Sequence, residues 1–455
     1  MRSYDLAIIG SGPGGYVSGL YASRNELKVC VIEKDLVGGT CLNKGCIPTK
    51  SLINSASIFG RLKDAQNYGV DIDGYHVNFQ RMMLRKDEVV TRLRAGIETL
   101  FKANKIDLIR QNASLKNHNT ISLSGSEDIE AKYIVIAAGS KPAKLAGTIV
   151  SGEAGVMSSD EALSMKELPK SITIVGGGVI GCEFASLFNL LGVNVAIVEF
   201  MDRLIPGQSR EASKKLEVIF KKRGIGIFLS SKVEGITGKD PIKISVSGGK
   251  LLESEKVLIS VGRQSATEGL GLENAGVKVE NGKIVVDEYL RANSDNTYAI
   301  GDCISGPLLA HKASYDGMLA CDNILGKKRM RDYSNVPNCI WTDPEISSVG
   351  LTEEEARKRY PDLKIAKFPY LASGKAYLRG SVEGYIKLMG DPEGNIAGVE
   401  IMGEGACDLI GEATLARTAG VKIDEWSHVV HGHPTLSEIF HEATHIFAGT
   451  PIHGL

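Results

Sequence analysis

The chain has 455 residues, a formal net charge of -1 and 43% hydrophobic residues. That length exceeds the usual size of a single hydrophobic core and suggests about three domains. Because basic and acidic residues balance, no general excess of positive charge draws the chain to nucleic acid or to an anionic membrane surface. We therefore expect a multidomain globular protein that binds neither nucleic acid nor a membrane.

The N-terminal residues carry no pattern of a signal or transit peptide. The first apolar run, residues 4–10, begins almost at once, and no cleavage-site pattern follows it. The longest apolar runs, such as residues 133–138, are far shorter than a membrane span. We expect a cytoplasmic protein, or the mature form of an organelle-matrix protein, in which most of the eight cysteines are free thiols.

Two segments of the chain repeat one plan. In the first, a buried strand at 4–9 runs into the glycine-rich loop 10–15, a helical stretch follows, and a second strand, 28–32, ends at Glu33. In the second, a strand at 171–175 leads into the loop 176–181, a helix at 182–191 and a strand at 194–198 that ends at Glu199. Each glutamate lies 23 positions after the first glycine of its loop (10 to 33 and 176 to 199). This repetition predicts two dinucleotide-binding units of the Rossmann type.

The loop residues have separate tasks in such a unit. The first glycine permits a tight turn, the second lets the backbone approach a pyrophosphate, and the third lets helix and strand pack closely. The helix N-terminus supplies aligned N–H groups to the anion. The glutamate accepts hydrogen bonds from a ribose 2′-OH and repels a 2′-phosphate, so the second site should prefer NAD to NADP. The candidates are Gly10, Gly12, Gly15 and Glu33 in the first unit, and Gly176, Gly178, Gly181 and Glu199 in the second.

The rest of the chain alternates between returning strands and smaller excursions. Strands ending in glycine at 133–139 and 256–263 are expected to return to the two parent sheets. In the stretches 114–126 and 230–254, apolar and polar residues alternate and turn residues intervene, which is typical of small antiparallel sheets. From about residue 336 the pattern is mixed, with a helix near Thr352, strands at 385–388 and 396–402, and helices from about 408. This last region has no nucleotide loop and is expected to form a separate domain.

Cys41 and Cys46 lie in a stretch rich in glycine, asparagine and lysine, which directly follows the second strand of the first unit. A zinc site needs four ligands, but the other cysteines, at 30, 182, 303, 321, 339 and 407, are scattered. Two inert core thiols are an alternative, since free cysteine is often buried. We favour a redox-active disulfide beside the first dinucleotide site. A helix starting after Cys46, with Lys50 one turn in, would stabilise a thiolate, although Lys50 could equally be a solvated surface lysine.

Thiol–disulfide exchange also needs a base, and the chain offers a candidate near its C-terminus. His433 and Glu438 lie five positions apart. On spacing alone, residues 435–438 (Thr-Leu-Ser-Glu) fit a helix capping box better than a catalytic role for Glu438. His433 could be a buried histidine, and nothing in the sequence joins residue 433 to residue 41 in space.

Six motifs together resemble those of the flavoprotein disulfide reductases. They are GSGPGGY at 10–16, GGTCLNKGCIPTKSL at 38–52, IVGGGVIGCEFAS at 174–186, VEF at 198–200, YAIGDC at 298–303 and HPTLSE at 433–438. The resemblance covers nearly the whole chain in the family's order. It implies an α/β fold of two Rossmann-like dinucleotide-binding domains plus a C-terminal α+β dimerisation domain. The expected bounds are 1–143 for FAD binding, 144–265 for NAD binding, 266–335 for a central segment completing the FAD site, and 336–455 for dimerisation.

The resemblance also assigns roles to residues. Cys41 looks like the thiol that exchanges with substrate and Cys46 like the thiol that faces the flavin. Lys50 looks like the lysine near the flavin, with Glu183 as its ion-pair partner. Gly139, Asp302, Ala310 and Gly262 match cofactor-binding positions. His433 matches the catalytic base and Glu438 the acid that orients it, both supplied in the family by the partner subunit of a homodimer.

Within this family the closest likeness is to members that oxidise protein-bound dihydrolipoyl groups with NAD, through FAD. The implied partner is a lipoyl-bearing protein of a 2-oxo acid dehydrogenase or glycine cleavage complex. Two other members of the family are weaker matches. A glutathione reductase should have several basic residues near Glu199 to bind NADPH, but only Arg203 is present there. A mercuric reductase should have a cysteine pair at its C-terminus, but residues 453–455 contain no cysteine. A non-catalytic subunit that binds nucleotides only for stability is a further alternative.

Overall fold

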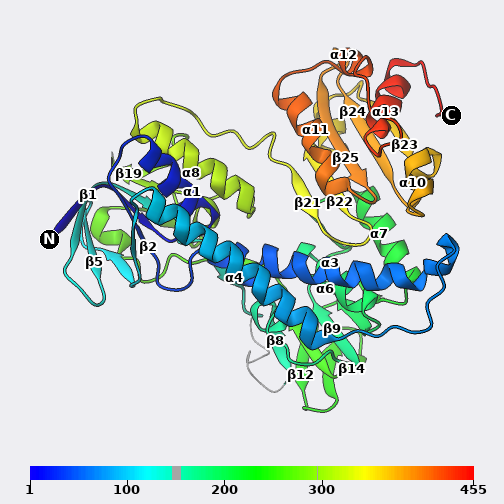
Figure 1. Cartoon of the computed structure of the whole chain (residues 1–455), viewed down its shortest axis with the longest axis horizontal. Coiled ribbons are helices and arrows are strands. Elements are labelled where there is room, and N and C mark those ends of the chain that lie inside the picture. Colours follow the sequence, from blue (N-terminus) through cyan, green and yellow to red (C-terminus); the bar gives the residue numbers. More distant parts are fainter. Residues whose placement is uncertain (146–154, 295, 455) are drawn as a thin grey trace.

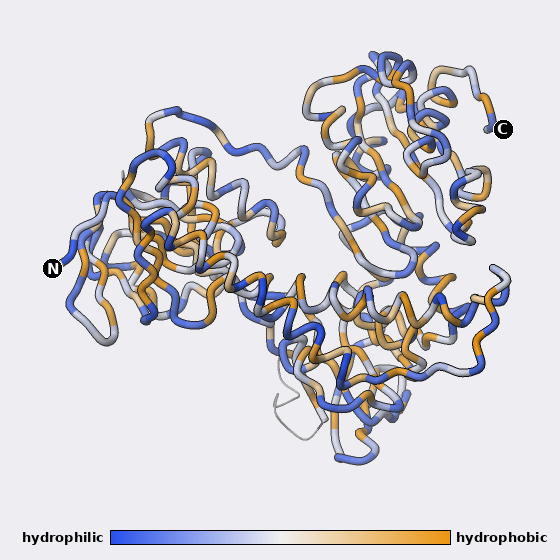
Figure 2. Tube along the Cα trace, in the orientation of Figure 1, coloured by the Kyte–Doolittle hydropathy of each residue, from blue (hydrophilic) through white to orange (hydrophobic). Residues whose placement is uncertain are grey.

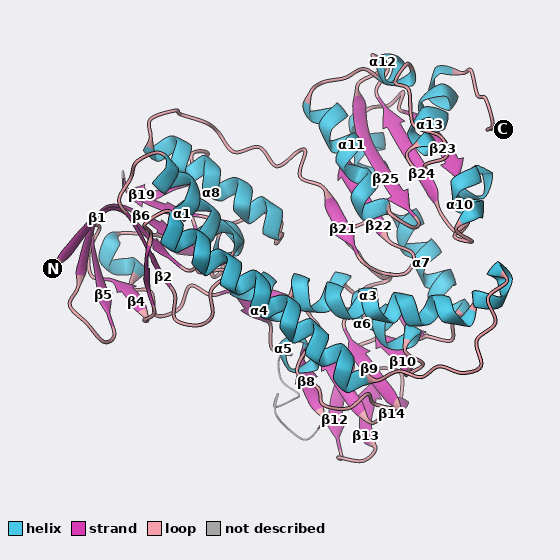
Figure 3. Ribbon diagram, in the orientation of Figure 1, coloured by secondary structure: helices cyan, strands magenta, loops and turns pink. Residues whose placement is uncertain are grey.

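The computed structural model describes residues 1–145, 155–294 and 296–454. It shows three bodies, one at each end of the long helices α3 (Cys46–Lys63) and α4 (Phe79–Ala103) and a third above them (Figure 1). Helices cover the sheets in each body (Figure 3). The apolar residues follow the inner strands, as the hydropathy trace shows (Figure 2). The predicted α/β fold class is confirmed.

The first body is built on an eight-stranded sheet. Six of its strands follow the path β19-β20-β6-β1-β2-β3, and β5, which pairs with β4, also pairs with β6. β1 pairs in parallel with β2 and β6, and β20 joins the other edge of β6 in parallel. Helices α1 and α8 lie side by side against this sheet (Figure 1). The elements are β1 (Arg2–Ile9), α1 (Pro13–Arg24), β2 (Val29–Ile32), α2 (Gly39–Lys44), β3 (Asp107–Ile109), β4 (Ala113–Leu115), β5 (Thr120–Leu123), β6 (Ile129–Ile136), β19 (Arg291–Ser294), β20 (Thr297–Ala299) and α8 (Ala310–Ile324).

The second body repeats this arrangement on a smaller scale. Its five strands run in parallel in the order β11-β10-β9-β15-β8, and an antiparallel sheet, β12-β13-β14, extends from it. The elements are β8 (Val156–Ser158), α5 (Ser159–Ala162), β9 (Ser171–Val175), α6 (Val179–Leu190), β10 (Asn194–Val198), α7 (Arg210–Lys222), β11 (Gly226–Phe228), β12 (Val233–Thr237), β13 (Ile242–Val246), β14 (Lys250–Ser254) and β15 (Lys256–Ile259).

The third body carries an antiparallel sheet in the order β21-β22-β25-β24-β23. Its first helix begins where the sequence predicts, because Thr352 caps α9 in a complete capping box with Glu355. The elements are β21 (Asn338–Ile340), β22 (Ile346–Gly350), α9 (Glu353–Arg359), β23 (Lys364–Pro369), α10 (Gly374–Leu378), β24 (Tyr385–Gly390), β25 (Ile396–Met402), α11 (Ala406–Thr418), α12 (Ile423–Ser427) and α13 (Glu438–Ala448).

The first and second bodies are joined by a short two-stranded sheet that the sequence patterns did not predict. β7 (Ser140–Pro142), just after the first sheet, pairs antiparallel with β16 (Arg263–Ser265), just after the second. The two crossings between the bodies therefore lie side by side. Within the described parts of the chain, no helix is both long and apolar enough to cross a lipid bilayer.

Candidate active site

The two glycine-rich loops have nearly the same geometry. Gly10 and Gly176 have φ values of +104° and +109°, and a Cβ at either position would lie within 2.5 Å of a carbonyl oxygen of the neighbouring strand's end. A Cβ on Gly15 or Gly181 would lie 1.9 Å from the oxygen of Gly10 or Gly176, respectively. Only glycine therefore allows these turns to close so tightly against helix and strand.

The middle glycine of each loop faces open space. Gly12 and Gly178 are the N-caps of α1 and α6, and neither helix start has a side-chain cap. A Cβ on Gly12 would meet nothing nearer than 3.9 Å, and one on Gly178 nothing within 4 Å. The first N–H groups of both helices are thus directed to a space that a pyrophosphate fits. Both loops follow the carboxyl end of a central parallel strand, where dinucleotides bind in such folds.

Both predicted ribose-binding glutamates lie against their own loops. Glu33 Oε2 accepts hydrogen bonds from the N–H and the hydroxyl of Ser11, at 2.9 and 2.7 Å. Glu199 accepts from the N–H groups of Gly177 and Met201. Each carboxylate has about four acceptor positions, so acceptor capacity remains on both for a ribose hydroxyl.

The cysteine pair lies beside the first loop. The N–H of Gly38 donates to the oxygen of Ser11 at 3.0 Å, and a Cβ on Gly39 would lie 2.6 Å from the Cα of Gly12. Gly39 opens α2, which carries Cys41, and Cys46 is the first residue of α3. The backbone contact between the two glycines fixes the thiols next to the nucleotide loop.

Both thiols are free and half-buried in the structure. The hydrogen bond from Cys41 lowers the pKa of Cys46 to about 7; burial opposes this effect and the charge of Lys50 adds to it. The same hydrogen bond raises the pKa of Cys41. Cys46 is therefore the thiol that the site holds as a thiolate near neutral pH.

Lys50 and Glu183 form the ion pair that the resemblance implies, with Lys50 Nζ 2.7 Å from Glu183 Oε2. The Lys50 side chain is 26% exposed, so it is not the freely solvated lysine of the alternative interpretation. The other oxygen of Glu183 accepts the N–H of Trp341 at 3.0 Å. This pair connects the cysteine helix α3, helix α6 of the second body and the end of β21.

Three of the four remaining predicted cofactor positions lie at the short β7–β16 sheet: Gly139 and Gly262 directly precede its two strands, and Asp302 contacts Ser140 of β7. Gly139 and Gly262 follow β6 and β15 with φ of +71° and +116°. Asp302 Oδ2 accepts the hydroxyl of Ser140 at 2.6 Å, and Arg263 Nε donates to that hydroxyl oxygen at 2.7 Å. Ala310 is the first residue of α8, whose start has no side-chain cap. No sequence signal marks Ser140 and Arg263 as partners, because their contact depends on the pairing of β7 with β16 between the bodies.

A buried ion pair behind Asp302 was also missed. Lys312 and Asp316 are fully buried and 2.8 Å apart. They hold the Gly301 peptide from both sides, because Lys312 Nζ donates to its oxygen and Asp316 accepts its N–H, each at 3.0 Å. The pair was predictable in principle, because a lysine and an aspartate four positions apart on an otherwise apolar helix face indicate a buried ion pair.

His433 and Glu438 are brought together, with His433 Nδ1 2.8 Å from Glu438 Oε1. The capping box predicted from spacing is wrong: α13 begins at Glu438 after Ser437, and the Thr435 hydroxyl donates to the Gly432 oxygen instead of capping the helix. Only the contact from the Thr435 N–H to Glu438 Oε2 survives, at 2.9 Å. One carboxylate therefore serves the turn and the histidine at once.

The His433 side chain is 79% exposed, so it is not a buried histidine. Burial opposes ionisation of Glu438, but the hydrogen bonds from His433 and Thr435 outweigh it and lower the pKa of this carboxyl. The chain does not bring His433 to Cys41. α13 lies in the third body, well apart from α3 (Figure 1).

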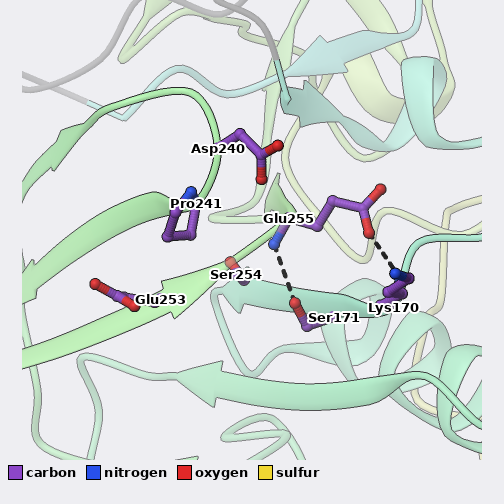
Figure 4. Close-up of a pocket in the computed structure, with 7 residues that line it drawn as sticks. All are labelled: Lys170, Ser171, Asp240, Pro241, Glu253, Ser254 and Glu255. Atoms are coloured by element: carbon purple, nitrogen blue, oxygen red, sulfur yellow. Dashed lines mark hydrogen bonds between the residues drawn. The ribbon is translucent and has the colours of Figure 1, made fainter.

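A surface hollow elsewhere is unrelated to these groups. It is lined by Lys170, Ser171, Asp240, Pro241, Glu253, Ser254 and Glu255 (Figure 4). Ser171 opens β9, whereas the Gly176 loop follows the end of that strand. The hollow therefore lies at the amino end of the sheet, opposite to the dinucleotide loop, and its acidic lining does not suit a phosphate.

Comparison with known proteins gives matches over nearly the whole chain. The family model for pyridine nucleotide-disulphide oxidoreductases matches residues 4–317, and the model for the dimerisation domain of these proteins matches residues 336–444. A dihydrolipoyl dehydrogenase of Bacillus subtilis is 41% identical, with 99% of both chains aligned. One from Thermus scotoductus is 39% identical over 100% of this chain and 99% of its own. Among solved structures, the Cu(II) complex of the HOCl-induced flavoprotein disulfide reductase RclA from Escherichia coli matches with a TM-score of 0.90 and 30% identity, covering 98% of this chain and 100% of that chain.

Proposed function

The chain belongs to the pyridine nucleotide-disulphide oxidoreductase family, and we propose that it is a dihydrolipoyl dehydrogenase that uses FAD and NAD. The observation that carries the disulfide chemistry is the contact of the cysteine helix with the first nucleotide loop, where Gly39 meets Gly12. Dihydrolipoyl groups are proposed as the substrate because the relatives that are 41% and 39% identical over nearly the full length are dihydrolipoyl dehydrogenases.

The two loops divide the cofactors between them. FAD is assigned to the loop of Gly10, Gly12 and Gly15 because the thiols adjoin it. NAD is assigned to the loop of Gly176, Gly178 and Gly181. Glu33, Lys50, Gly139, Asp302 and Ala310 complete the proposed FAD site, and Glu183, Glu199 and Gly262 belong to the NAD side. Bound FAD supplies the two-electron relay between thiols and NAD. The proposed domains are residues 1–143, 144–265, 266–335 and 336–455.

The thiol chemistry is a sequence of two exchanges, starting from the Cys41–Cys46 disulfide. His433 of the partner subunit takes a proton from one substrate thiol, and the resulting thiolate attacks Cys41. The bond to Cys46 breaks and Cys46 leaves as a thiolate beside Lys50 and the N-terminus of α3. The second substrate thiol then attacks the substrate sulfur bound to Cys41, the bond to Cys41 breaks, and Cys41 leaves as a thiol with the second proton. The lipoyl disulfide departs, and two electrons remain in the protein as the dithiol.

His433 is proposed to act on the partner subunit's cysteines, which requires a homodimer. The 79% exposure of its side chain supports this role. Leu415 and Val430, on the same body, are 70% and 94% exposed and offer an apolar surface to a second copy. We further propose that the enzyme is a cytoplasmic homodimer and that it oxidises dihydrolipoyl groups carried by other chains.

A mixed dimer tests the shared site. In a dimer of one His433→Gln chain and one Cys41→Ser chain, one of the two sites contains both lesions and the other contains neither. We expect dihydrolipoamide oxidation by the mixed dimer to recover to about half of the wild-type rate per dimer, while each variant alone stays at least about 100-fold slower. Mixed dimers that remain inactive would show that each site lies within a single chain.

The substrate class is tested by comparing dihydrolipoamide with NAD against glutathione disulfide with NADPH. We expect turnover only with the first pair. The second pair is disfavoured because the carboxylate of Glu199 would repel the 2′-phosphate of NADPH. Reduction of glutathione disulfide at a comparable rate would replace the proposal with a glutathione reductase.

A further inference from the structure

A second pair of cysteines meets in the third body. Cys339 lies on β21 and Cys407 is the second residue of α11, 68 positions further along the chain. β21 pairs with β22, where Cys339 is opposite Ser347. The Ser347 hydroxyl donates to the oxygen of Ala406 at 2.6 Å and so fixes the start of α11 against this strand.

Each thiol contacts the backbone of the segment that carries the other cysteine. Cys339 Sγ lies 3.8 Å from the oxygen of Cys407, and Cys407 Sγ lies 3.6 Å from the oxygen of Ile340. The side chains also share a hydrogen bond. A disulfide, with sulfur atoms about 2.0 Å apart, would therefore join two segments whose cysteine side chains already contact each other's segment.

The surroundings distinguish this pair from the other cysteines outside the active site. Cys30, Cys182, Cys303 and Cys321 are buried, and burial raises the pKa of each thiol. Cys339 and Cys407 are only half-buried. The hydrogen bond from Cys407 lowers the pKa of Cys339; burial and Glu345 oppose this effect, and Lys50 adds to it.

We propose that Cys339 and Cys407 are a second redox-active dithiol, which hydrogen peroxide oxidises to an intrachain disulfide joining β21 to α11. The Cys339 thiolate attacks one peroxide oxygen, the O–O bond breaks, and a sulfenic acid and hydroxide form. The Cys407 thiol then attacks the sulfenic sulfur, the S–O bond breaks and water leaves. Two thiols and one peroxide thus give one disulfide and two waters. These steps involve neither FAD nor NAD, so the inference holds whichever substrate the enzyme takes.

The site is connected to the proposed active site. Cys339 lies two residues before Trp341, whose N–H donates to Glu183, and Glu183 pairs with Lys50. A disulfide at this position would fix the strand end that carries this hydrogen bond. Oxidation of this pair would therefore affect a strand end that is hydrogen-bonded to the Lys50–Glu183 ion pair.

The experiment uses the full-length holoenzyme with Cys41→Ser and Cys46→Ser, so that the first pair cannot consume peroxide. After peroxide treatment, mass spectrometry of the non-reduced digest should find a peptide linking Cys339 to Cys407 within one chain, and dithiothreitol should remove it. The thiols of this pair should disappear at least about tenfold faster than that of Cys30. Further substitution of Cys339→Ser or Cys407→Ser should abolish the linked peptide, whereas Cys30→Ala should leave it unchanged.

Other outcomes would overturn the proposal. Conversion of Cys339 and Cys407 each to a sulfinic acid with no linked peptide would contradict it, and so would two thiols that both remain open to alkylation after treatment. A link between two chains, visible as a covalent dimer on a non-reducing gel, would also exclude the intrachain disulfide. In the Cys407→Ser variant, a sulfenic acid trapped at Cys339 by dimedone would confirm which thiol reacts first.

Discussion

The Cys46 sulfur is stabilised as a thiolate by neighbours that act on one atom. The Cys41 thiol donates a hydrogen bond to it, and the ammonium of Lys50 lies one turn further along α3. Cys46 is also the first residue of that helix, where the unpaired N–H groups favour a negative charge. These effects outweigh burial, which alone would raise the pKa of the thiol.

Removing the cation should weaken this stabilisation measurably. In Lys50→Met, we expect the pKa of Cys46 to rise from about 7 toward the ordinary thiol value of 9.0, by about one unit. Alkylation of Cys46 by iodoacetamide, followed across pH by mass spectrometry, measures the midpoint. Lys44→Met is the matched control, because Lys44 pairs with Asp35 at 2.9 Å and is 47% exposed. A midpoint that is equal in both variants would remove Lys50 from this role.

At the residue scale, the sequence predicts side chains better when their partners are near in the chain. His433 and Glu438 are five residues apart, and this spacing fits either a helix cap or a catalytic pair. In the structure, Glu438 binds both the His433 ring and the N–H of Thr435. Cys339 and Cys407 looked scattered because 68 positions separate them. Their contact depends on α11 docking against β22, which no local pattern encodes.

At the scale of elements, glycine is needed in the second nucleotide loop for two different reasons. Gly181 is needed by the fold, since a Cβ there would lie 1.9 Å from the Gly176 oxygen. Gly178 has an extended backbone and open space around its Cβ position. The fold tolerates a side chain at Gly178, so the reason for glycine there is the approach of a ligand.

Substitution by alanine separates these two reasons. Gly178→Ala should leave the free energy of unfolding within about 0.5 kcal/mol of wild type, but weaken NAD binding at least about tenfold, which corresponds to about 1.4 kcal/mol. Gly181→Ala should weaken NAD binding and also destabilise the fold by about 2 kcal/mol. Urea unfolding and calorimetric titration with NAD measure the two quantities. Normal NAD affinity in Gly178→Ala would contradict the assignment of the second loop.

The elements themselves followed closely from periodicity and turn residues. The strands expected at 385–388 and 396–402 are β24 and β25, and the predicted excursions are the hairpin β4–β5 and the sheet β12-β13-β14. The pairing of β7 with β16 was not predictable, because each strand has only three residues and the partners lie far apart in the chain. Ser140 and Arg263 were missed for the same reason.

At the scale of the whole molecule, the second and third bodies share one hydrophobic core. Ile340, Ile346 and Tyr385 of the third body belong to the same cluster of buried side chains as Phe184 and Phe220 of the second. The third body is therefore fixed to the nucleotide-binding region within one chain, while Leu415 and Val430 remain exposed.

A buried lysine reinforces this junction. Lys387, on β24, is 1% exposed, and its Nζ lies 2.8 Å from Glu353 Oε2 and 2.5 Å from Glu211 Oε2. Glu211 belongs to α7 of the second body, and Oε1 of Glu400, on β25, lies 3.6 Å from the same Nζ. Burial disfavours the charge of Lys387, but these carboxylates outweigh it and raise its pKa above 10.5.

Replacing this lysine should loosen the junction. In Lys387→Met, the three carboxylates lose their shared cation. Because the side chains of Glu211 and Glu353 are 36% and 25% exposed and water can solvate them, we expect a loss of about 2 to 3 kcal/mol in the free energy of unfolding, below the full cost of breaking a buried pair. Lys367→Met is the control: Lys367 also pairs with Glu211, but its side chain is 41% exposed, so its loss should cost at most about 1 kcal/mol. Urea unfolding of both variants measures the difference.

The pH dependence of that difference follows from the sign of the shift. Because the folded pKa of Lys387 lies above the unfolded value of 10.5, its contribution is fully present below pH 10.5 and is lost only as pH rises through the folded pKa. The gap between wild type and Lys387→Met should therefore be equal at about pH 7 and pH 9. A gap that shrinks over this range, or a Lys367→Met variant equally destabilised, would show that the junction does not depend on the buried charge.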